Sequence, residues 1–370
     1  MQKPKVSIIV PVYNGAEFIG DTLRMILNTS MPDIEIIVID DGSKDDSVSI
    51  SQSVATEDSR VKVFCQKNTG VFGARNRGIK EAKGEFICFC DQDDVVESDA
   101  YEKMYFKAKE NNCQIVMAGT GKLIGEKREA FESFHDLVFE NDEIRKNYML
   151  PILFNGTNCY LGNYGMRIEN DIWKCMIKRN FVNENKIVFR HYVNYEDDFL
   201  FLLDILARAE KVVSISDVLY YWRVNLKSET YNTAYVNELY AKDIRLQNEI
   251  IDIMRIAEID NDYIELYRKC QNCNRYIHIV ENESRNKGKR YSQKISTIKE
   301  LQKEPEFNEC LKIRSSYKSN LIHRKIILAM MEKHLFAGAY LFHKTYVWVR
   351  GIGLRFQLWT KIENFLYSKG

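Results

Sequence analysis

Apolar runs and amphipathic segments alternate along the first 120 residues of the chain. Strands are predicted where short runs are continuously apolar and rich in β-branched residues, at 6–10, 34–39, 61–64, 85–90 and 115–118. Helices are predicted where apolar residues recur at helical spacing, at 15–28, 47–55, 72–82 and 101–111. Strands that alternate with helices in this way indicate βαβ units. The pattern therefore predicts an α/β fold whose mainly parallel, Rossmann-like sheet is flanked by helices.

The pattern changes after this region. Residues 120–165 are less regular, residues 235–310 read as helical, and residues 311–370 combine helical spacing with basic and aromatic residues. We therefore expect an α/β domain over 1–225, with a first half over about 1–120 and a second half over about 121–225, a helical extension over 226–310 and basic amphipathic C-terminal helices over 311–370.

Polar residues follow each of the first four predicted strands. These segments are PVYN at 11–14, DDGS at 40–43, NTGVFGARN at 68–76 and DQDD at 91–94. Ligands of parallel sheets bind beyond the carboxyl ends of the strands, where such segments converge. A binding site is therefore expected at this edge of the sheet.

Asp91, Asp93 and Asp94 follow the fourth predicted strand directly. This spacing suits a hard divalent cation, which proteins often hold with one or two carboxylates plus the phosphates of a substrate. Such a cation, Mn²⁺ or Mg²⁺, neutralises charge on a diphosphate leaving group. The alternative is a solvated acidic turn, and the companion motifs favour the metal.

Two other strand-end motifs each allow a binding and a structural interpretation. A carboxylate in the DDGS motif can accept a hydrogen bond from a nucleotide base or ribose, or can form an Asx turn before a helix. The glycine loop over 68–78 lacks both the dinucleotide pattern G-x-G-x-x-G and the lysine of a P-loop. In that loop Arg75 can bind a diphosphate or form an ion pair with the carboxylates.

Further acidic and basic candidates lie near residue 200. Glu196 and Asp197 precede a predicted helix, and a carboxylate here can act as a general base on a hydroxyl or can cap the helix. Trp222 and Arg223 lie in a segment that can bind a phosphate or form an edge strand.

Five motifs, in this order, closely resemble the family 2 inverting glycosyltransferases, which have the GT-A fold of nucleotide-diphospho-sugar transferases. The matching segments are VSIIVPVYN (6–14), IIVIDDGSKDDS (36–47), NTGVFGARNRGI (68–79), GEFICFCDQDD (84–94) and YEDDFLF (195–201). Together they cover roughly residues 5–225, and five ordered motifs are more specific than any one of them.

The resemblance implies roles for particular residues. Asp197 would be the catalytic base that activates the acceptor hydroxyl. Asp93 or Asp94 would contact the metal, a divalent cation (Mn²⁺ or Mg²⁺). The substrate-binding residues implied by the resemblance are Pro11, Tyr13, Asn14, Asp41, Arg75, Asp91, Trp222 and Arg223, of which Asp41 would bind the nucleotide base.

The charge of the chain is unevenly distributed. The net charge is only +1, but residues 311–370 hold 11 basic and two acidic residues. Basic helices with aromatic apolar faces suit an anionic membrane surface, and no nucleic-acid-binding motif is present, so peripheral membrane contact is expected and nucleic acid is not. Packing on the rest of the protein or formation of a homodimer are the alternatives for this segment.

Neither a signal peptide nor an apolar run of roughly 18 residues occurs in the sequence. We therefore expect a cytoplasmic protein, at the inner face of the cell membrane, whose nine cysteines are mostly reduced and buried. Cys270 and Cys273 form a lone C-x-x-C without the second pair of ligands that a zinc site needs, so packing is the expected role of both.

The expected function is transfer of a sugar, with inversion, from a nucleotide sugar (UDP-linked) to a hydroxyl of a glycan or lipid-linked acceptor in bacterial surface polysaccharide synthesis. A sugar nucleotidylyltransferase is an alternative, although that class is expected to have a glycine- and lysine-rich N-terminal loop where this chain has PVYN. A catalytically silent scaffold is a second alternative, but such a protein has no reason to keep mutually repelling carboxylates together.

Overall fold

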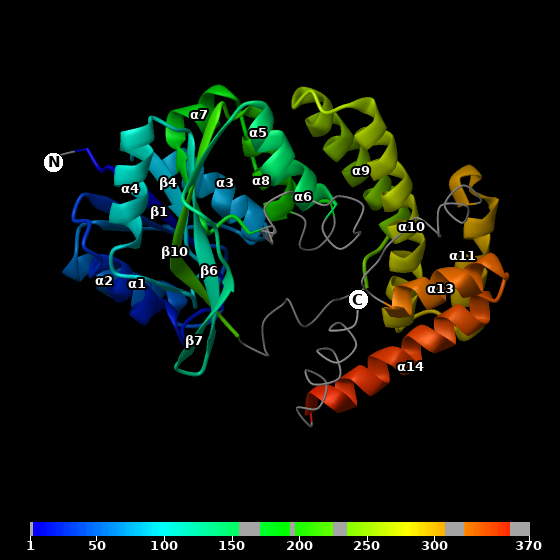
Figure 1. Cartoon of the computed structure of the whole chain (residues 1–370). Coiled ribbons are helices and arrows are strands. Elements are labelled where there is room, and N and C mark those ends of the chain that lie inside the picture. The colour runs from blue at the N-terminus through cyan, green and yellow to red at the C-terminus, as the bar shows by residue number, and fades with distance from the viewer. Residues whose placement is uncertain (1–2, 155–170, 193–196, 225–234, 308–321, 356–370) are drawn as a thin grey trace. The chain divides into compact units, whose positions relative to one another are not determined.

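The computed structural model describes residues 3–154, 171–192, 197–224, 235–307 and 322–355 (Figure 1). These residues form two compact units. The first contains residues 3–152, 171–191 and 197–224, and the second contains the remaining described residues. The three-part division expected from the sequence stays a prediction.

The first unit is built on a ten-stranded mixed sheet. Its strands are β1 (Val6–Val12), β2 (Ile34–Asp40), β3 (Val61–Cys65), β4 (Phe86–Phe89), β5 (Val95–Val96), β6 (Ile115–Ile124), β7 (Lys127–Glu132), β8 (Leu137–Glu140), β9 (Cys175–Lys178) and β10 (Lys211–Arg223). Its helices are α1 (Ile19–Leu27), α2 (Ser47–Glu57), α3 (Val71–Glu81), α4 (Ala100–Asn111), α5 (Asp142–Ile144), the π-helical turn η1 (Arg145–Met149), α6 (Leu150–Leu153), α7 (Arg179–Glu184) and α8 (Asp197–Arg208).

The strand order is β3-β2-β1-β4-β9-β6-β10-β5, with β7 beside β6 and β8 beside β10. The first four strands in this order are parallel, as are β6 and β10, whereas β9 runs antiparallel between β4 and β6. The expected α/β fold, with a mainly parallel mixed sheet, flanking helices and a helical C-terminal region, is confirmed. Residues 221–223 end the long strand β10, which lies between β6 and β5 and is not an edge strand.

Different helices cover the two faces of the sheet. On one face, alternate side chains of β1 share a core with residues of α1 and α4. On the other face α3 approaches β1 so closely that a Cβ atom added to Gly78 would lie 2.3 Å from Cγ2 of Ile9. Because β1 is buried on both faces, its sequence is continuously apolar instead of alternating.

The second unit is helical. Its elements are α9 (Leu239–Ile256), α10 (Asn261–Arg285), α11 (Tyr291–Glu300), the 3₁₀ turn η3 (Leu301–Lys303), α13 (Ile322–Glu332) and α14 (Phe336–Arg355). One hydrophobic core holds α10, α11, α13 and α14 together, through residues such as Tyr276, Ile298, Leu328 and Tyr340. Within the described ranges, no helix combines the length and the apolar character that a membrane crossing requires.

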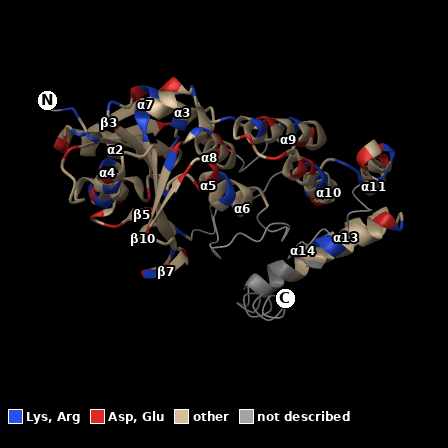
Figure 2. Ribbon diagram, turned by 45° about the horizontal axis from the view of Figure 1, so that its top comes forward, with Lys and Arg blue, Asp and Glu red and all other residues tan. Residues whose placement is uncertain are grey.

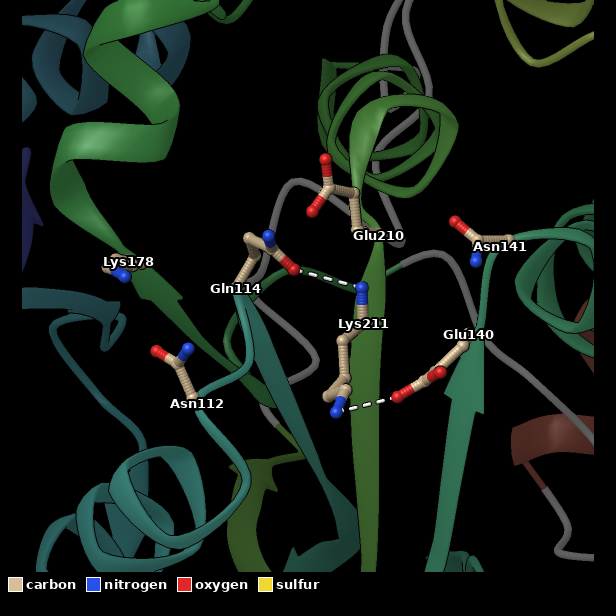
Figure 3. Close-up of a pocket in the computed structure, with 7 residues that line it drawn as sticks. All are labelled: Asn112, Gln114, Glu140, Asn141, Lys178, Glu210 and Lys211. Carbon is tan, nitrogen blue, oxygen red and sulfur yellow. Dashed lines mark hydrogen bonds and ion pairs between the residues drawn. The ribbon is translucent and has the colours of Figure 1, made fainter.

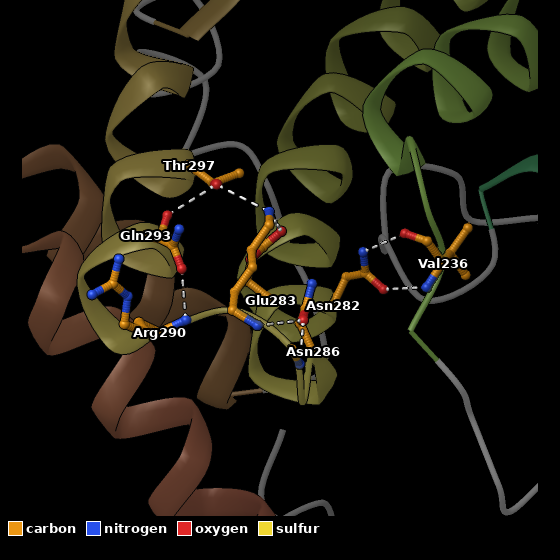
Figure 4. Close-up of polar contacts among 9 residues, drawn as sticks. Val236, Asn282, Glu283, Asn286, Arg290, Gln293 and Thr297 are labelled. Atoms are coloured by element: carbon orange, nitrogen blue, oxygen red, sulfur yellow. Dashed lines mark hydrogen bonds and ion pairs between the residues drawn. The ribbon is translucent and has the colours of Figure 1, made fainter.

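Polar contacts fix the chain around the end of α10 (Figure 4). The side-chain amide of Asn282 exchanges two hydrogen bonds of 2.8 Å with the backbone of Val236. Further along, the Gln293 side chain accepts a hydrogen bond of 2.8 Å from the backbone N–H of Arg290, which caps α11. Cys270 and Cys273 are buried in α10, as expected for packing residues. Cys270 is a free thiol, like five other described cysteines, whereas Cys273 is disulfide-bonded.

Candidate active site

The chain after β1 is fixed by hydrogen bonds and leaves one aromatic ring exposed. Pro11 is buried in β1, opposite Ile39 of β2. Asn14 adopts a positive φ of 50°, its Oδ1 accepts a hydrogen bond of 2.8 Å from the backbone N–H of Lys44, and its polar atoms therefore hold this loop against the loop after β2. Tyr13 is 43% exposed, so its ring is available for a ligand at this edge of the sheet.

Asp41 binds the glycine loop. Its buried carboxylate accepts hydrogen bonds from the backbone N–H groups of Thr69 (2.9 Å) and Gly70 (2.8 Å) and from Nε2 of Gln66 (2.8 Å). The preceding Asp40 accepts bonds from the backbone of Gly42, as in an Asx turn. Asp41 therefore determines the path of the loop that leads into α3, and its contact with a nucleotide base stays a prediction.

Arg75 in α3 connects the acidic motifs. Its guanidinium is 3.0 Å from Oδ1 of Asp91 and also forms an ion pair with Asp198, in the first turn of α8. The side chain is buried, and its guanidinium carbon lies 5.5 Å from the ring centroid of Phe189. Of the two interpretations open for Arg75, the structure shows the ion pair with carboxylates.

The acidic turn after β4 divides its carboxylates between different partners. Asp91 binds Arg75 as described. Asp94 is buried, and its two oxygens accept hydrogen bonds from the hydroxyl of Tyr220 (2.6 Å) and from the backbone N–H of Arg223 (2.8 Å). The Asp93 carboxylate accepts a hydrogen bond from its own backbone N–H, and no other described residue is seen to donate one to it. Asp93 is therefore the carboxylate of this turn that remains open to a ligand.

Burial and mutual repulsion perturb these carboxyl groups. Burial, with the charge of Asp91, raises the pKa of Asp93 to about 6. Burial is also the main cause of the raised pKa of Asp94, to which Asp91 and Asp93 contribute. Mutual repulsion of this kind shows an excess of negative charge that a bound cation would relieve.

The fit of this turn to a divalent cation follows from its donor set. No three His, Cys, Asp or Glu side chains in the described part of the chain are arranged to hold a metal ion. Mg²⁺, however, is usually bound by one or two carboxylates together with substrate phosphates, without a complete protein cage. Asp93 and Asp91 fit that smaller donor set, whereas Asp94 is occupied by Tyr220 and Arg223.

Asp197 begins α8 and lies close to a histidine. Nδ1 of His191 is 2.8 Å from Oδ1 of Asp197. Burial raises the pKa of Asp197, while His191 and the charge of Arg75 oppose the increase. Burial likewise raises the pKa of Asp198 to about 6, despite its ion pair with Arg75. Glu196, the other acidic residue proposed here, lies outside the described residues.

The end of β10 brings its aromatic and basic residues to the acidic turn. Arg223 donates a hydrogen bond of 2.8 Å from Nε to the backbone oxygen of Asp93, and its guanidinium lies 5.1 Å from the ring centroid of Phe18. Trp222 is half-buried against the sheet core and has the Lys122 ammonium 5.4 Å from its ring. Both predicted residues are therefore on the same edge as Asp93, and Arg223 fastens the turn.

Sequence reasoning missed three residues that shape the site. The Tyr220 hydroxyl accepts a bond of 3.0 Å from the backbone N–H of Asp91 while it donates to Asp94. The side chain of Gln92 exchanges two hydrogen bonds with the backbone of Tyr13. His191, the third, binds Asp197. Gln92 stood inside the acidic motif and could have been identified there, whereas Tyr220 and His191 carry no local signal.

A separate polar pocket of about 350 Å³ lies at the beginning of β6 and β10, at the opposite edge of the sheet. Figure 3 shows Lys211 between Gln114 and Glu140. The backbone N–H of Lys211 donates a hydrogen bond to Gln114, and its ammonium group forms an ion pair with Glu140. None of the predicted site residues lines this pocket, so it is not part of the candidate active site.

Known proteins match the chain over most of its length. The glycosyl transferase family 2 model matches residues 7–169. A cholesterol galactosyltransferase of Borreliella burgdorferi is 28% identical over 336 residues, which cover 87% of this chain and 90% of that protein. A poly(ribitol-phosphate) beta-glucosyltransferase of Bacillus spizizenii is 32% identical over 237 residues, which cover 63% of this chain and 34% of that protein.

A solved structure with the same fold is S. aureus TarS 1-349 in complex with UDP. It superposes with a TM-score of 0.58 at 16% sequence identity, and the match covers 92% of this chain and 91% of that chain.

Proposed function

Because this chain belongs to glycosyl transferase family 2 and is therefore a glycosyltransferase, we propose that it transfers a sugar from a nucleoside diphosphate sugar to an acceptor hydroxyl with inversion at the anomeric carbon. The observation that carries this proposal is the position of Arg75. Its buried guanidinium holds Asp91 of the acidic turn and Asp198, the neighbour of Asp197, so the donor-side and acceptor-side carboxylates occupy one edge of the sheet. The family match favours this function over the nucleotidylyltransferase and the silent scaffold.

In the proposed reaction Asp197 accepts the proton of the acceptor hydroxyl. The acceptor oxygen forms a bond to the anomeric carbon, and the bond between that carbon and the nucleoside diphosphate breaks, with its electron pair leaving on the diphosphate. A single displacement of this kind inverts the configuration, as it does in inverting glycosidases. The raised pKa of Asp197 suits the task, because a stronger base takes the proton more readily.

Asp93, together with Asp91, would hold the divalent cation, Mn²⁺ or Mg²⁺. When bound, such a cation neutralises charge on the diphosphate leaving group. Tyr220 and Arg223 bind Asp94 and fix the turn, and within the described residues no residue other than Asp93 itself donates a hydrogen bond to the Asp93 carboxylate. Asp94, which we also expected as a metal ligand, is in this proposal a residue that fixes the turn.

The nucleotide would lie against the loops after β1 and β2. Tyr13 offers an exposed ring for stacking, Asp41 offers a carboxylate, and Pro11 and Asn14 form the adjoining backbone. We propose a UDP-sugar as the donor. TarS, which shares only the fold, was crystallised with UDP, so the choice of nucleotide has to be measured.

We propose a glycan or lipid-linked acceptor in surface polysaccharide synthesis at the inner face of the cell membrane. Two related proteins have names that specify a lipid, cholesterol, and a cell-surface polymer, poly(ribitol-phosphate). The second unit supports membrane contact, since α14 has no acidic residue (Figure 2). It also exposes Leu341 and Trp348, the latter 67% exposed. The alternative is that this face forms a homodimer, and the test of membrane contact must distinguish the two.

The proposed function is tested with a panel of UDP-glucose, UDP-galactose, UDP-N-acetylglucosamine and GDP-mannose, each with Mn²⁺ or Mg²⁺, in which release of nucleoside diphosphate is measured. One donor should be turned over by the wild type. The Asp197→Asn variant should lose turnover but bind that donor with nearly unchanged affinity in calorimetry. Turnover close to that of the wild type in Asp197→Asn would remove Asp197 from the role of base.

A further inference from the structure

His191 occupies one oxygen of the proposed base and leaves the other open. Nδ1 of His191 lies 2.8 Å from Oδ1 of Asp197, and none of the described residues forms a hydrogen bond with Oδ2. A carboxylate ion can only accept hydrogen bonds, so Nδ1–H is the donor when Asp197 is ionised. An acceptor hydroxyl can therefore approach the second oxygen without displacing a contact from any described residue.

The imidazole ring of His191 is held in place from a second direction. It stacks on the ring of Phe72 with the centroids 5.0 Å apart and the planes inclined by 8°. Phe72 lies in the first turn of α3, and its own ring lies close over Gly70, where an added Cβ atom would be 3.0 Å from Cε1 of Phe72. Gly70 adopts a φ of +86°, which favours glycine, and its N–H donates to Asp41.

From these contacts we propose that His191 is a positioning residue for the transfer reaction, which fixes the orientation of the Asp197 carboxylate and keeps it ionised. This inference rests on the proposed function, in which Asp197 is the base. A histidine whose tautomer is set by a carboxylate is a known means of orienting a reacting group. The stack on Phe72 further links this orientation to the glycine loop that Asp41 binds.

The charged groups around Asp197 determine in which direction its pKa changes when the His191 donor is removed. Burial raises the pKa of Asp197, and His191 and Arg75 both oppose that increase. Asp198 is the neighbouring carboxylate, and it is paired with Arg75. Removal of the His191 donor therefore raises the pKa of Asp197 further, and the base is protonated over a wider pH range. A hydrogen bond to a charged group corresponds to a change of about tenfold or more in an equilibrium constant.

Two substitutions separate the donor from the ring. His191→Phe keeps an aromatic ring on Phe72 but removes the donor, and His191→Asn keeps a donor near the position of Nδ1 but removes the stack. The full-length variants are assayed by nucleoside diphosphate release from whichever donor of the panel the wild type turns over. In His191→Phe the acid limb of the kcat profile should move to higher pH by about one pH unit, with the KM for the donor within about twofold. In His191→Asn the acid limb should move less.

The outcomes distinguish this inference from the proposed function. An unchanged acid limb in His191→Phe, together with an inactive Asp197→Asn variant, overturns the role of His191 alone. An active Asp197→Asn variant overturns the assignment of the base itself. Loss of activity in His191→Phe at every pH, without a moved acid limb, also contradicts the proposal, because it indicates a structural role.

A second measurement does not depend on turnover. The protein has six histidines, and ¹⁵N labelling of histidine with His191→Phe as the reference identifies the His191 signals. We expect the Nδ1–H tautomer in the wild type and the Nε2–H tautomer in Asp197→Asn, because the carboxylate no longer selects the proton position. An Nε2–H tautomer in the wild type overturns the proposal.

Discussion

Asp91 and Asp198 are bound by the same buried guanidinium, that of Arg75. One carboxylate follows β4, and the other lies in the first turn of α8, 123 residues beyond Arg75. The ion pairs therefore set the relative position of the acidic turn and the proposed base.

Arg75→Ala should destabilise the first unit strongly. The substitution leaves Asp91 and Asp198 without their cation, and removal of one partner from a buried ion pair costs about 3–5 kcal/mol. Arg75→Lys should lose less, since a lysine retains the charge but cannot hold both carboxylates with a fork of donors. Urea unfolding measures the effect. Arg255→Ala, at an exposed pair with Asp252, is the control and should cost less than about 1 kcal/mol.

Asp93 should make the metal-free protein less stable as the pH rises. Its pKa is about 6 in the folded protein against an ordinary value of 3.8, so between these values the folded state retains a proton that the unfolded state has lost. The free energy of unfolding then falls between about pH 4 and pH 6, by on the order of 3 kcal/mol. In urea unfolding with EDTA present, Asp93→Asn should remove the part of this decrease that Asp93 contributes, while the contribution of Asp198, whose pKa is also about 6, remains.

Addition of Mn²⁺ with UDP should raise the melting temperature of the wild type and leave that of Asp93→Asn nearly unchanged. Asp46→Asn, at an exposed carboxylate, is the matched control and should behave as the wild type does. Equal stabilisation of both proteins by Mn²⁺ would count against Asp93 as a metal ligand.

Tyr220→Phe should loosen the acidic turn. The substitution removes the acceptor of the Asp91 backbone N–H and the donor to Asp94, and an unsatisfied buried group costs about 1–3 kcal/mol. The free energy of unfolding in urea and the metal-dependent affinity for UDP should both decrease. Tyr276→Phe is the control, because the buried hydroxyl of Tyr276 has no hydrogen-bond partner in the described structure, and its removal should be neutral. Equal losses in the two variants would contradict this role for Tyr220.

The exposed face of α14 should carry membrane binding. Leu341 and Trp348 are 52% and 67% exposed and lie two helical turns apart, with Lys344 between them. Replacement of both by Gln should reduce flotation with anionic phosphatidylglycerol vesicles at least several-fold, because aromatic and apolar side chains enter the interface. Phe106→Gln, at a 60% exposed position in the first unit, should bind as the wild type does.

Two results would contradict the membrane assignment. Unchanged flotation of the double variant would exclude this face as the contact. A wild-type dimer that dissociates in the double variant, without any binding to vesicles, would instead assign the face to a second copy of the chain.

The alternation of strands and helices was predictable because burial on both faces of a parallel sheet leaves a strong local signal. The convergence of the motifs was predictable for the same reason, since parallel strands end at one edge. Asp91 and Asp41 therefore lie at the edge of the sheet that was predicted from the sequence. The beginning of the long strand β10 was not predicted, because its extent there is determined by its pairing with β6 and β8.

The sequence did not indicate which carboxylates bind other protein groups and which remain open to a ligand. Asp93 and Asp94 are adjacent and chemically identical, and they are distinguished by the approach of Tyr220 and the backbone of Arg223 from β10 to Asp94. His191 is likewise an ordinary residue in the sequence, and its ring stacks on Phe72 of α3. The Tyr220–Asp94 and His191–Phe72 contacts each join segments more than 100 residues apart, so no local pattern records them.

Gly78 has a consequence for how this enzyme can change over generations. It lies one turn beyond Arg75 in α3 and touches Ile9 of β1, where even a methyl group has no room. In an exchange of Gly78 for alanine, Ile9 or α3 would have to shift, and any shift of α3 would move Arg75 relative to its two carboxylates. Such a lineage would keep every acidic residue of the motifs and lose the catalyst, so an intact set of motifs is no guarantee of an active descendant.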